Sequence, residues 1–349
     1  MAVNLASKYS DKLTTVYVKE SVVAGRLSDD YEFTGVKTVK IVTAQTVPMG
    51  EYKRTGTNRY GEPQEMQDTV QELTLTQDRS FSLTVDKGNN MDQLNLKGAG
   101  KVAKLQIAER AVPESDKYCL TVLANKAGTI VGNSTALSKS NIVDRISDGT
   151  QALDDAEVPA AGRTLFVSAG VYKLLKHSDE FIAVERLGEK ALTKGVVGEY
   201  DNMTVVKVPA GRWPANVNFI IVHYRAATNP VKINDLKIHV DPPGLSGNLM
   251  EGRNYYDCFV IGSRCKGVYV EVDTGSGKGT VCAAPTLAGS TLSTTTGGAK
   301  IKWTIDGSDP RYSPTAVEGT TVSGTGTVRA YAYKDGSFPS PVAVLEKKS

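Results

Sequence analysis

The chain has 349 residues, of which 40% are hydrophobic and 23% are charged. This composition is typical of folded globular proteins and excludes wholesale disorder, and the length predicts two domains, or one large domain with an appendage. With 41 Lys and Arg against 38 Asp and Glu, the net charge is only +3. A histone-like or repressor-like protein, which binds by neutralising many phosphates, is therefore excluded.

The amino-terminal segment carries no recognisable export signal. MAVNLASKYSDKLTTVYVKE lacks the apolar core of a signal peptide, and no later run is long enough to span a bilayer. We therefore predict a protein made and used in the cytoplasm. Its four cysteines (Cys119, Cys258, Cys265 and Cys282) match no zinc-binding spacing, and in a reducing compartment we expect free thiols.

The three histidines offer no basis for metal or triad chemistry. His177, His223 and His239 lie in no HExxH or CxxC pattern and beside no GxSxG serine. The apolar run around His223, Asn218–Tyr224, predicts a buried strand histidine, and His177 is predicted to lie at a helix end. Neither is expected to be a ligand or a general base.

Two other motifs resemble catalytic or phosphate-binding sequences without meeting their requirements. In VDTGSGKGTV, Lys278 is followed by Gly279, whereas a phosphate-binding loop needs Ser or Thr there and a helix afterwards. The adjacent carboxylates Asp154 and Asp155 are predicted to be solvated charges in a polar loop. We assign no catalytic, cofactor-binding or metal-binding residue and predict a protein that is not an enzyme.

The amino-terminal third is rich in β-strand patterns. Residues 31–47 predict a strand that leads into a polar stretch rich in Gly and Pro, residues 49–69. Residues 71–86 alternate apolar and polar side chains, and we predict a long β-hairpin there with its turn at Gln77–Ser80. Such a hairpin has little core of its own, so we expect it to project and to be stabilised from outside its domain.

A long amphipathic helix follows the predicted hairpin. Apolar residues recur at spacings of three and four from about residue 92 to residue 126. Because Pro113 interrupts the pattern, the segment predicts one kinked helix or two helices in tandem. At 1.5 Å per residue it would be about 50 Å long, more than a compact domain requires.

The next region predicts an α+β subdomain. Residues 141–241 alternate strand and helix patterns, including a strand, turn and helix in RTLFVSAGVYKLLKH and strands around a turn in VVGEYDNMTVVKVP. Two further strands in NYYDCFVIGSRCKGVYVEV, joined through residues 262–267, are predicted to return the chain to the earlier sheet.

The carboxyl-terminal part differs sharply in composition. Ser, Thr, Gly and Ala dominate from residue 274 to residue 298, and residues 274–279 predict a flexible linker. Short strands after it predict a small β-sandwich of about 70 residues that folds independently. Ile301, Trp303 and Ile305 alternate with polar residues, so all three are expected on the buried face of one strand.

The order of these elements resembles the major capsid protein of tailed bacteriophages with the Hong Kong 97 type fold. LTLTQDRSFSLTVDKGNN is similar to the returning arm of that family's extended loop, and AERAVPESDKYCLTVLA to its long spine helix. VPAAGRTLFVSAGVYKLL is similar to the start of its axial domain, and DCFVIGSRCKGVYVEV to the closing strands of its peripheral domain.

The resemblance implies an α+β shell-forming domain over residues 1–273. Within it we expect an amino-terminal arm at about 1–30, an extended loop at about 45–90, a spine helix at about 92–126 and an axial subdomain at about 141–241. The implied function is structural: self-assembly through hexamers and pentamers into an icosahedral shell around double-stranded DNA, without cofactors. The implied location is the virion, after assembly in the host cytoplasm, with scaffolding and portal proteins as partners and no sequence-specific DNA binding or membrane contact.

The tail has a resemblance of its own. WTIDGSDPRYSPT, followed by VSGTGTVRAYAYKDGSFPSPV, is similar to the immunoglobulin-like module at the carboxyl end of some chitobiases. That resemblance implies an all-β module over residues 280–349 that is used for stability and display, on the outer surface when fused to a capsid subunit. Contact with a host surface or a glycan is the partner class it suggests.

Two other functions compete with this interpretation. A bacterial surface or binding protein with an immunoglobulin-like module would fit the tail equally well, but it needs export and the sequence shows no signal peptide. A polysaccharide-processing enzyme would need paired carboxylates in a barrel or cleft. Residues 1–273 show neither the repeating β/α pattern nor aromatic enrichment, since aromatic residues are only 7% of the chain.

Overall fold

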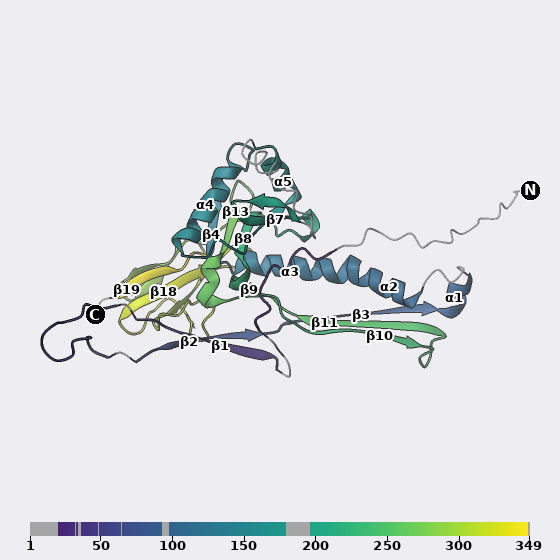
Figure 1. The fold of residues 1–349 in the computed structure, drawn as a ribbon, viewed down its shortest axis with the longest axis horizontal. Coiled ribbons are helices and arrows are strands. Elements are labelled where there is room, and N and C mark those ends of the chain that lie inside the picture. Colours follow the sequence, from purple (N-terminus) through teal and green to yellow (C-terminus); the bar gives the residue numbers. More distant parts are fainter. Residues whose placement is uncertain are drawn as a thin grey trace, which may run out of the picture.

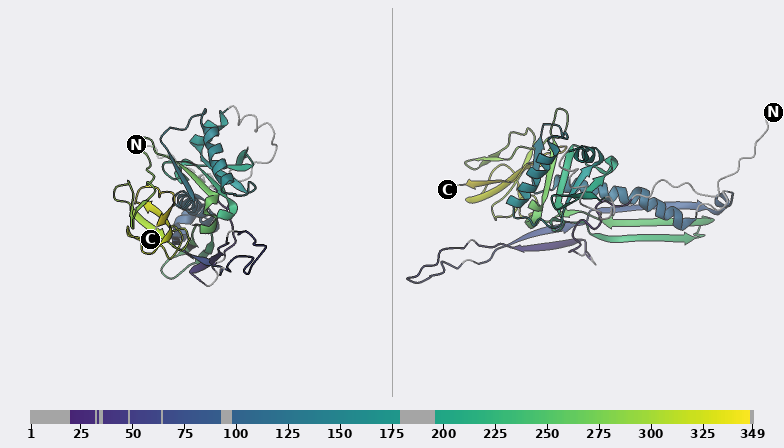
Figure 2. Two further views of the ribbon diagram at one scale, coloured as in Figure 1. Left: turned by 90° about the vertical axis from the view of Figure 1, so that its left-hand side faces the viewer. Right: turned by 45° about the horizontal axis from the view of Figure 1, so that its top comes forward.

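The computed structural model describes residues 20–31, 33, 36–47, 49–63, 65–92, 98–178 and 196–347. Most of the expected amino-terminal arm lies outside them. The molecule is elongated, and two arms extend from a central body in opposite directions (Figures 1 and 2). One arm holds β1, β2 and the loop between them, and the other holds β3, β10 and β11 beside a long helix.

A six-stranded mixed sheet forms the centre of the body. Its strand order is β4-β13-β8-β5-β7-β6. The strands are β4 (Thr129–Asn133), β5 (Arg163–Ser168), β6 (Val196–Tyr200), β7 (Met203–Val208), β8 (Val217–His223) and β13 (Val268–Asp273). β13 pairs parallel with β4, β5 pairs parallel with β7, and the other neighbours are antiparallel.

Helices cover both faces of this sheet. α4 (Ile142–Asp155) and α5 (Ala169–Lys176) pack on one face together with Phe219 and Ile221 of β8. The other face, with Ile220 and Val222, packs against α3 (Val112–Asn125). All residues of β8 are buried, which explains why its sequence is a continuous apolar run rather than an alternating one.

The sheet extends beyond the expected axial segment, residues 141–241. β4 precedes that segment and β13 follows it, whereas β10 (Val231–Val240) lies inside it but pairs in another sheet. The expected return of the chain through residues 262–267 is confirmed, because the 3₁₀ turn η4 (Gly262–Gly267) leads directly into β13. β6 and β7 flank the expected turn, where Asp201 and Asn202 have φ of 49° and 57°, as a two-residue hairpin turn requires.

The long helix consists of α2 (Ala99–Gln106), one π-helical turn η1 (Ile107–Ala111) and α3. Pro113 does not separate two helices, because the flanking residues Gln106, Ala111 and Val112 all keep helical dihedrals. Pro113 has no N–H to donate to the preceding turn of the helix. The wider π turn just before it accommodates this missing hydrogen bond. The described helix has 27 residues, Ala99–Asn125, and is about 40 Å long. The sequence pattern predicts a helix that starts at about residue 92 and is about 50 Å long.

The start of the predicted helix belongs elsewhere. Asp92 ends a separate short helix, α1 (Lys87–Asp92), and the following expected positions, 93–97, lie outside the described residues. α1 directly follows β3, which ends at Asp86. Residue 92, predicted as the start of the long helix, therefore belongs to this separate helix.

The predicted hairpin at residues 71–86 is wrong. β2 (Asp68–Thr74) and β3 (Gln77–Asp86) do not pair with each other. β2 pairs antiparallel with β1 (Thr38–Ala44), and β3 pairs antiparallel with β11 (Gly247–Tyr256), which also pairs with β10. The expected turn Gln77–Ser80 is therefore the first part of β3, and the two strands extend into opposite arms of the molecule (Figure 2).

Short elements connect these sheets. They are η2 (Ala210–Arg212), η3 (Tyr224–Ala226), β9 (Ala227–Thr228) and β12 (Phe259–Val260), and β9 pairs with β12. Phe259 joins Phe33, Leu73 and Leu75 in a small apolar cluster at the base of the β1–β2 arm. This cluster anchors the projecting arm to the body.

The carboxyl-terminal module has an apolar core of its own. A four-stranded sheet in the order β17-β16-β18-β19 and a two-stranded sheet β14-β15 build it. Their bounds are β14 (Thr286–Ala288), β15 (Thr291–Ser293), β16 (Lys300–Thr304), β17 (Val317–Glu318), β18 (Gly326–Tyr333) and β19 (Ala343–Lys347). Ile301 and Trp303 are buried as expected, but Ile305 is 47% exposed because β16 ends at Thr304.

Replacing Trp303 with alanine should destabilise the module by about 3–5 kcal/mol, because it removes a buried aromatic side chain from a small core. Calorimetric unfolding of the full chain measures the change. Ile305→Ala is the matched control, and we expect it to change the free energy of unfolding by less than about 1 kcal/mol. Equal destabilisation by both variants would contradict the assignment of the buried face.

Candidate assembly surfaces and the junctions behind them

The loop between β1 and β2 carries an unusual number of exposed apolar side chains. Met49 is fully exposed, Tyr60 is 92% exposed and Met66 is 65% exposed. Tyr52 and Tyr60 contact each other edge to face, with ring centroids 5.0 Å apart, but both rings stay at the surface. Apolar surface on a projecting arm is typical of a segment that is buried against a partner.

The opposite arm exposes a second apolar surface. β10 is an edge strand of the sheet β10-β11-β3, and Leu236, Ile238 and Val240 are 41%, 42% and 74% exposed. These three residues alternate along the strand and so share one face. An edge strand with an exposed apolar face can pair with another chain.

A buried ion pair fixes the start of the described chain to the long helix. Asp116 on α3 accepts hydrogen bonds from the Ser21 hydroxyl at 2.6 Å and the Val22 N–H at 3.0 Å. The Arg212 guanidinium donates to the same carboxylate at 2.6 Å and to the Glu20 carbonyl at 2.7 Å. Asp116 and Arg212 are nearly fully buried, so removal of either would leave an unpaired charge in the interior.

A second buried ion pair attaches α4 to the six-stranded sheet. Arg145 donates to both carboxylate oxygens of Glu271 on β13, at 2.9 and 2.5 Å, and Asn218 on β8 donates to Glu271 at 2.8 Å. Sequence reasoning missed both buried pairs, because each joins residues about a hundred or more positions apart and neither follows a local pattern.

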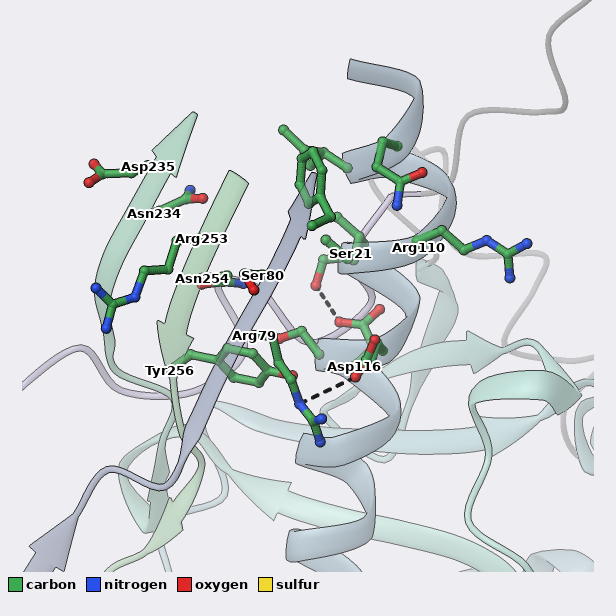
Figure 3. Close-up of a pocket in the computed structure, with 17 residues that line it drawn as sticks. Ser21, Arg79, Ser80, Arg110, Asp116, Asn234, Asp235, Arg253, Asn254 and Tyr256 are labelled. Carbon is green, nitrogen blue, oxygen red and sulfur yellow. Dashed lines mark hydrogen bonds and ion pairs between the residues drawn. The ribbon is translucent and has the colours of Figure 1, made fainter. Parts of the chain in front are cut away.

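A cavity of about 220 Å³ lies between the long helix and the sheet β10-β11-β3. Figure 3 shows Asp116 on the helix side and Asn234, Asp235 and Arg253 on the strand side. Three of its charged groups have partners within the chain: Arg253 binds Asp78 with two hydrogen bonds, Arg79 lies 3.4 Å from Glu114, and Asp116 binds Arg212. The arrangement holds the helix on the sheet and contains no histidine or cysteine for acid–base or nucleophilic chemistry.

The three histidines lie at separate places in the structure. His223 is buried at the end of β8 and its Nδ1 accepts a hydrogen bond from the Arg225 N–H, so the expectation of a satisfied strand histidine is confirmed. His177 caps the carboxyl end of α5, also as expected. His239 lies at the surface 3.2 Å from Glu251. The structure does not bring the three histidines into one site.

The placement of Asp154 and Asp155 in a polar loop is wrong. Both residues belong to the last turn of α4. Asp154 accepts a hydrogen bond at 2.6 Å from Arg163, whose side chain is only 2% exposed. The carboxylate therefore serves as the partner of a buried arginine, which a polar composition alone did not indicate.

The segment expected to be a flexible linker forms a hydrogen-bonded turn. Asp273, the last residue of β13, accepts a hydrogen bond from the Gly275 N–H at 3.0 Å and pairs with Lys278 at 2.5 Å. The Gly279 N–H donates to the Asp273 carbonyl at 3.1 Å. Lys278 is thus used to close a turn between the body and the module.

The module also contacts the carboxyl end of the long helix. Arg311 donates to the Ala127 and Gly128 carbonyls at 2.7 and 3.0 Å, and the Tyr312 hydroxyl donates to the Lys126 carbonyl. Asp309 orients the Arg311 guanidinium from within the module at 2.7 Å. Lys126 is the C-cap residue of α3, and residues 127 and 128 connect the helix to β4. Arg311 and Tyr312 therefore hold the segment that directly follows the helix, where a cation is favourable.

This contact alters nearby ionisation. Burial raises the pKa of the Cys265 thiol, which lies beside Arg311 and Asp309, to about 11, and it raises the pKa of Tyr312 well above its usual value. Both groups are therefore neutral at physiological pH. The module has its own core and also packs on the body, because Tyr312 and Phe338 contact the core cluster of the six-stranded sheet.

Among the residues that the structure describes, no group of three His, Cys, Asp or Glu side chains could hold a metal ion. The described helices also include none that is long and apolar enough to cross a membrane.

Arg311→Ala should weaken the attachment of the module by about 2–4 kcal/mol, because it removes charge-assisted hydrogen bonds and leaves carbonyl groups of residues 127 and 128 without a donor. Limited trypsin digestion should then cut faster at Lys278, and the midpoint of thermal unfolding should fall. Lys334→Ala, a change of surface charge elsewhere in the module, is the control. Unchanged cleavage in Arg311→Ala would contradict the role of Arg311 in attaching the module.

His223 predicts a loss of stability in acid. Burial lowers its pKa below the ordinary 6.5, and Arg163, Arg225 and Arg264 also disfavour the protonated ring. The unfolded chain therefore binds this proton more readily, and the free energy of unfolding should fall as the pH drops below 6.5.

Denaturant unfolding of wild type and His223→Gln between about pH 8 and pH 5 measures this effect. The variant should lose part of the pH dependence in that interval. His239→Gln retains His223 and should behave as wild type. A His223→Gln profile parallel to wild type would contradict the assignment.

Comparisons with known proteins agree with this architecture. A model of the Fn3 associated family matches residues 291–346. Comparison with curated protein sequences found no match. A solved structure from Mycobacterium phage Che8 is similar with a TM-score of 0.64 and 20% identity, covering 79% of this chain and 100% of that chain.

Two further solved structures are described as capsids. The capsid structure of the Cyanophage P-SCSP1u is similar with a TM-score of 0.61 and 10% identity, covering 78% of this chain and 94% of that chain. The asymmetric unit of the bacteriophage PhiM1 mature capsid is similar with a TM-score of 0.60 and 12% identity, covering 78% and 92%. The likeness of the sequence to phage capsid proteins is thus confirmed at the level of the fold, and over about four fifths of its length this chain has the α+β fold of phage capsid subunits, with a carboxyl-terminal module similar to the Fn3 associated family.

Proposed function

We propose that this chain is the major capsid protein of a tailed bacteriophage, with the Hong Kong 97 type of fold. Its role is structural: copies assemble through hexamers and pentamers into an icosahedral shell that encloses double-stranded DNA. The fold comparisons support this proposal over the alternative of an exported binding protein, because they cover the part of the chain that the alternative leaves unexplained.

The observation that carries the proposal is the projecting β1–β2 arm. Its loop, residues 45–67, exposes Met49, Tyr60 and Met66. The small cluster around Phe33 and Leu73 holds the base of the arm, together with hydrogen bonds of the Gln71 side chain. A subunit that folds alone gains nothing from such an arm. A subunit of a shell gains contact area, because arms that overlap neighbouring copies bury apolar surface that the isolated subunit exposes.

The remaining parts fit the same role. We propose residues 1–273 as the shell-forming domain, 274–279 as its connection and 280–349 as an immunoglobulin-like module on the outer surface. The module contacts the body through the segment around Arg311 and leaves strands such as β17 exposed. The connection and the module together carry the excess positive charge of the chain, whereas the shell part is nearly neutral, as suits a container that encloses DNA without tight binding.

Virion location, assembly in the host cytoplasm, and scaffolding and portal proteins as partners belong to this proposal. A tag at the carboxyl terminus, labelled with an antibody on intact particles, tests whether the module faces outward. Label on the particle surface is expected, and label only after the shell is opened would contradict the outer position.

Replacing residues 46–66 with an Asn-Gly turn should abolish assembly while the subunit still folds. The replacement keeps the β1–β2 pairing, whose last pair is Ala44 with Asp68, and Asn-Gly suits a tight hairpin. Negative-stain electron microscopy should show closed shells for wild type and none for the variant, with equal far-ultraviolet circular dichroism.

Val317→Ser is the matched control, since it removes an exposed apolar side chain from the module instead of the arm. It should still form shells. In wild type, protease cleavage within residues 49–69 should decrease when subunits assemble. Shells formed by the shortened variant, or equal cleavage of free and assembled subunits, would refute the role of the arm.

A further inference from the structure

We propose that Cys119 and Cys258 are an oxidation site, a thiol pair that reacts with a low-molecular-weight disulfide to form one intramolecular disulfide bond. Cys119 lies on α3 and Cys258 lies in the connection between β11 and β12. Their sulfur atoms are 2.7 Å apart, although 139 positions separate them in the sequence. Both thiols are free in the structure, so it describes the reduced form.

The residues next to the two cysteines hold their backbones together. The Tyr118 hydroxyl donates to one carboxylate oxygen of Asp257 at 2.8 Å. The other oxygen accepts from the Thr76 N–H at 2.7 Å and the Thr76 hydroxyl at 2.8 Å. Because this network joins positions 118 and 257, the sulfur atoms at 119 and 258 stay in contact, and a bond of about 2.05 Å requires only a small further approach.

The other two cysteines lack such a partner geometry. Cys265 contacts Asp309 and Arg311 at the junction with the module, and Cys282 lies in the core of the module. Both are buried. Cys265 and Cys282 are therefore internal controls for the selectivity of oxidation, because they are buried but have no second sulfur atom within reach.

The reaction is two successive thiol–disulfide exchanges. One cysteine loses its proton, its thiolate attacks a sulfur of the small disulfide, and one small thiolate leaves. The second cysteine then loses its proton and attacks the mixed disulfide, which releases the second small thiolate and forms the Cys119–Cys258 bond. The small disulfide is reduced by two electrons to two thiols, which take up the two protons.

Burial makes this reaction slow and the product stable. It raises the pKa of the Cys119 thiol well above the ordinary value, so the reactive thiolate forms mainly when the site opens briefly. Once formed, the bond closes a loop of more than a hundred residues and restricts the unfolded chain. It also ties α3 to the segment that joins the sheet β10-β11-β3 to the body.

The biological setting rests on the proposed function. A capsid subunit is assembled in a reducing cytoplasm and meets oxidising conditions after release from the host. The bond would therefore form after assembly and strengthen a particle that is already built.

The purified full chain, kept folded, is incubated with glutathione disulfide or with reduced glutathione, and the remaining thiols are then alkylated. Trypsin cleavage after Lys117, Lys126, Arg253 and Arg264 isolates the peptides 118–126 and 254–264. Mass spectrometry should find these two peptides linked in the oxidised sample only, with Cys265 and Cys282 alkylated. The midpoint of thermal unfolding should rise by several degrees on oxidation.

Cys258→Ser should lose both the linked peptide and the rise in midpoint, whereas the matched control Cys282→Ser should keep both. The peptide map of wild type alone decides the pairing if Cys258→Ser does not fold. Four alkylated cysteines after prolonged oxidation, a persistent mixed disulfide, or links to Cys265 or Cys282 would overturn the proposal. Since the test needs no assembly, its failure would leave the capsid proposal intact, and failed assembly would not affect this result.

Discussion

Helix α3 contacts the first described residues, the six-stranded sheet and the carboxyl-terminal module, and the arrangement of these parts depends on its contacts. Asp116 binds the first described residues and Arg212, while Leu120 and Leu123 are fully buried against the six-stranded sheet. At its end, the carbonyl groups of residues 126–128 accept hydrogen bonds from the module. One helix therefore joins the amino-terminal segment, the six-stranded sheet and the module.

This concentration of contacts explains the division between a rigid centre and exposed arms. The amino-terminal half of the helix, α2, buries only Ala103 and rests on the sheet β10-β11-β3, and the β1–β2 arm has a base cluster but an exposed loop. Ordering such arms costs conformational entropy that their own contacts offset poorly. In the proposed shell, neighbouring copies would bury these arms and supply the missing contacts. The proposed shell therefore accounts for the extended shape of the subunit.

The largest difference between expectation and structure concerns strand pairing. Residues 71–86 alternate in sequence as a hairpin should, and burial alternates from Phe81 to Val85 in β3. Their partners, however, are β1 and β11, and β11 is about 170 positions away. Periodicity reports which side chains share a face, but it carries no information about which distant strand offers matching hydrogen bonds. Ile305 shows the same limit at a strand end, where a turn moves the next apolar residue out of the core.

By itself, the sequence determined the kinds of element, the buried run at β8, the buried Trp303 and the change of composition before the module. These follow from local chemistry, because side-chain polarity and spacing act within a few residues. Tertiary structure alone decided the Asp116–Arg212 pair, the hydrogen bonds of Arg311 to residues 127 and 128 after α3, and the contact of Cys119 with Cys258. Each of these joins groups that about a hundred or more residues separate, and only the packing of the completed chain brings such groups within the few ångströms over which hydrogen bonds and ion pairs act.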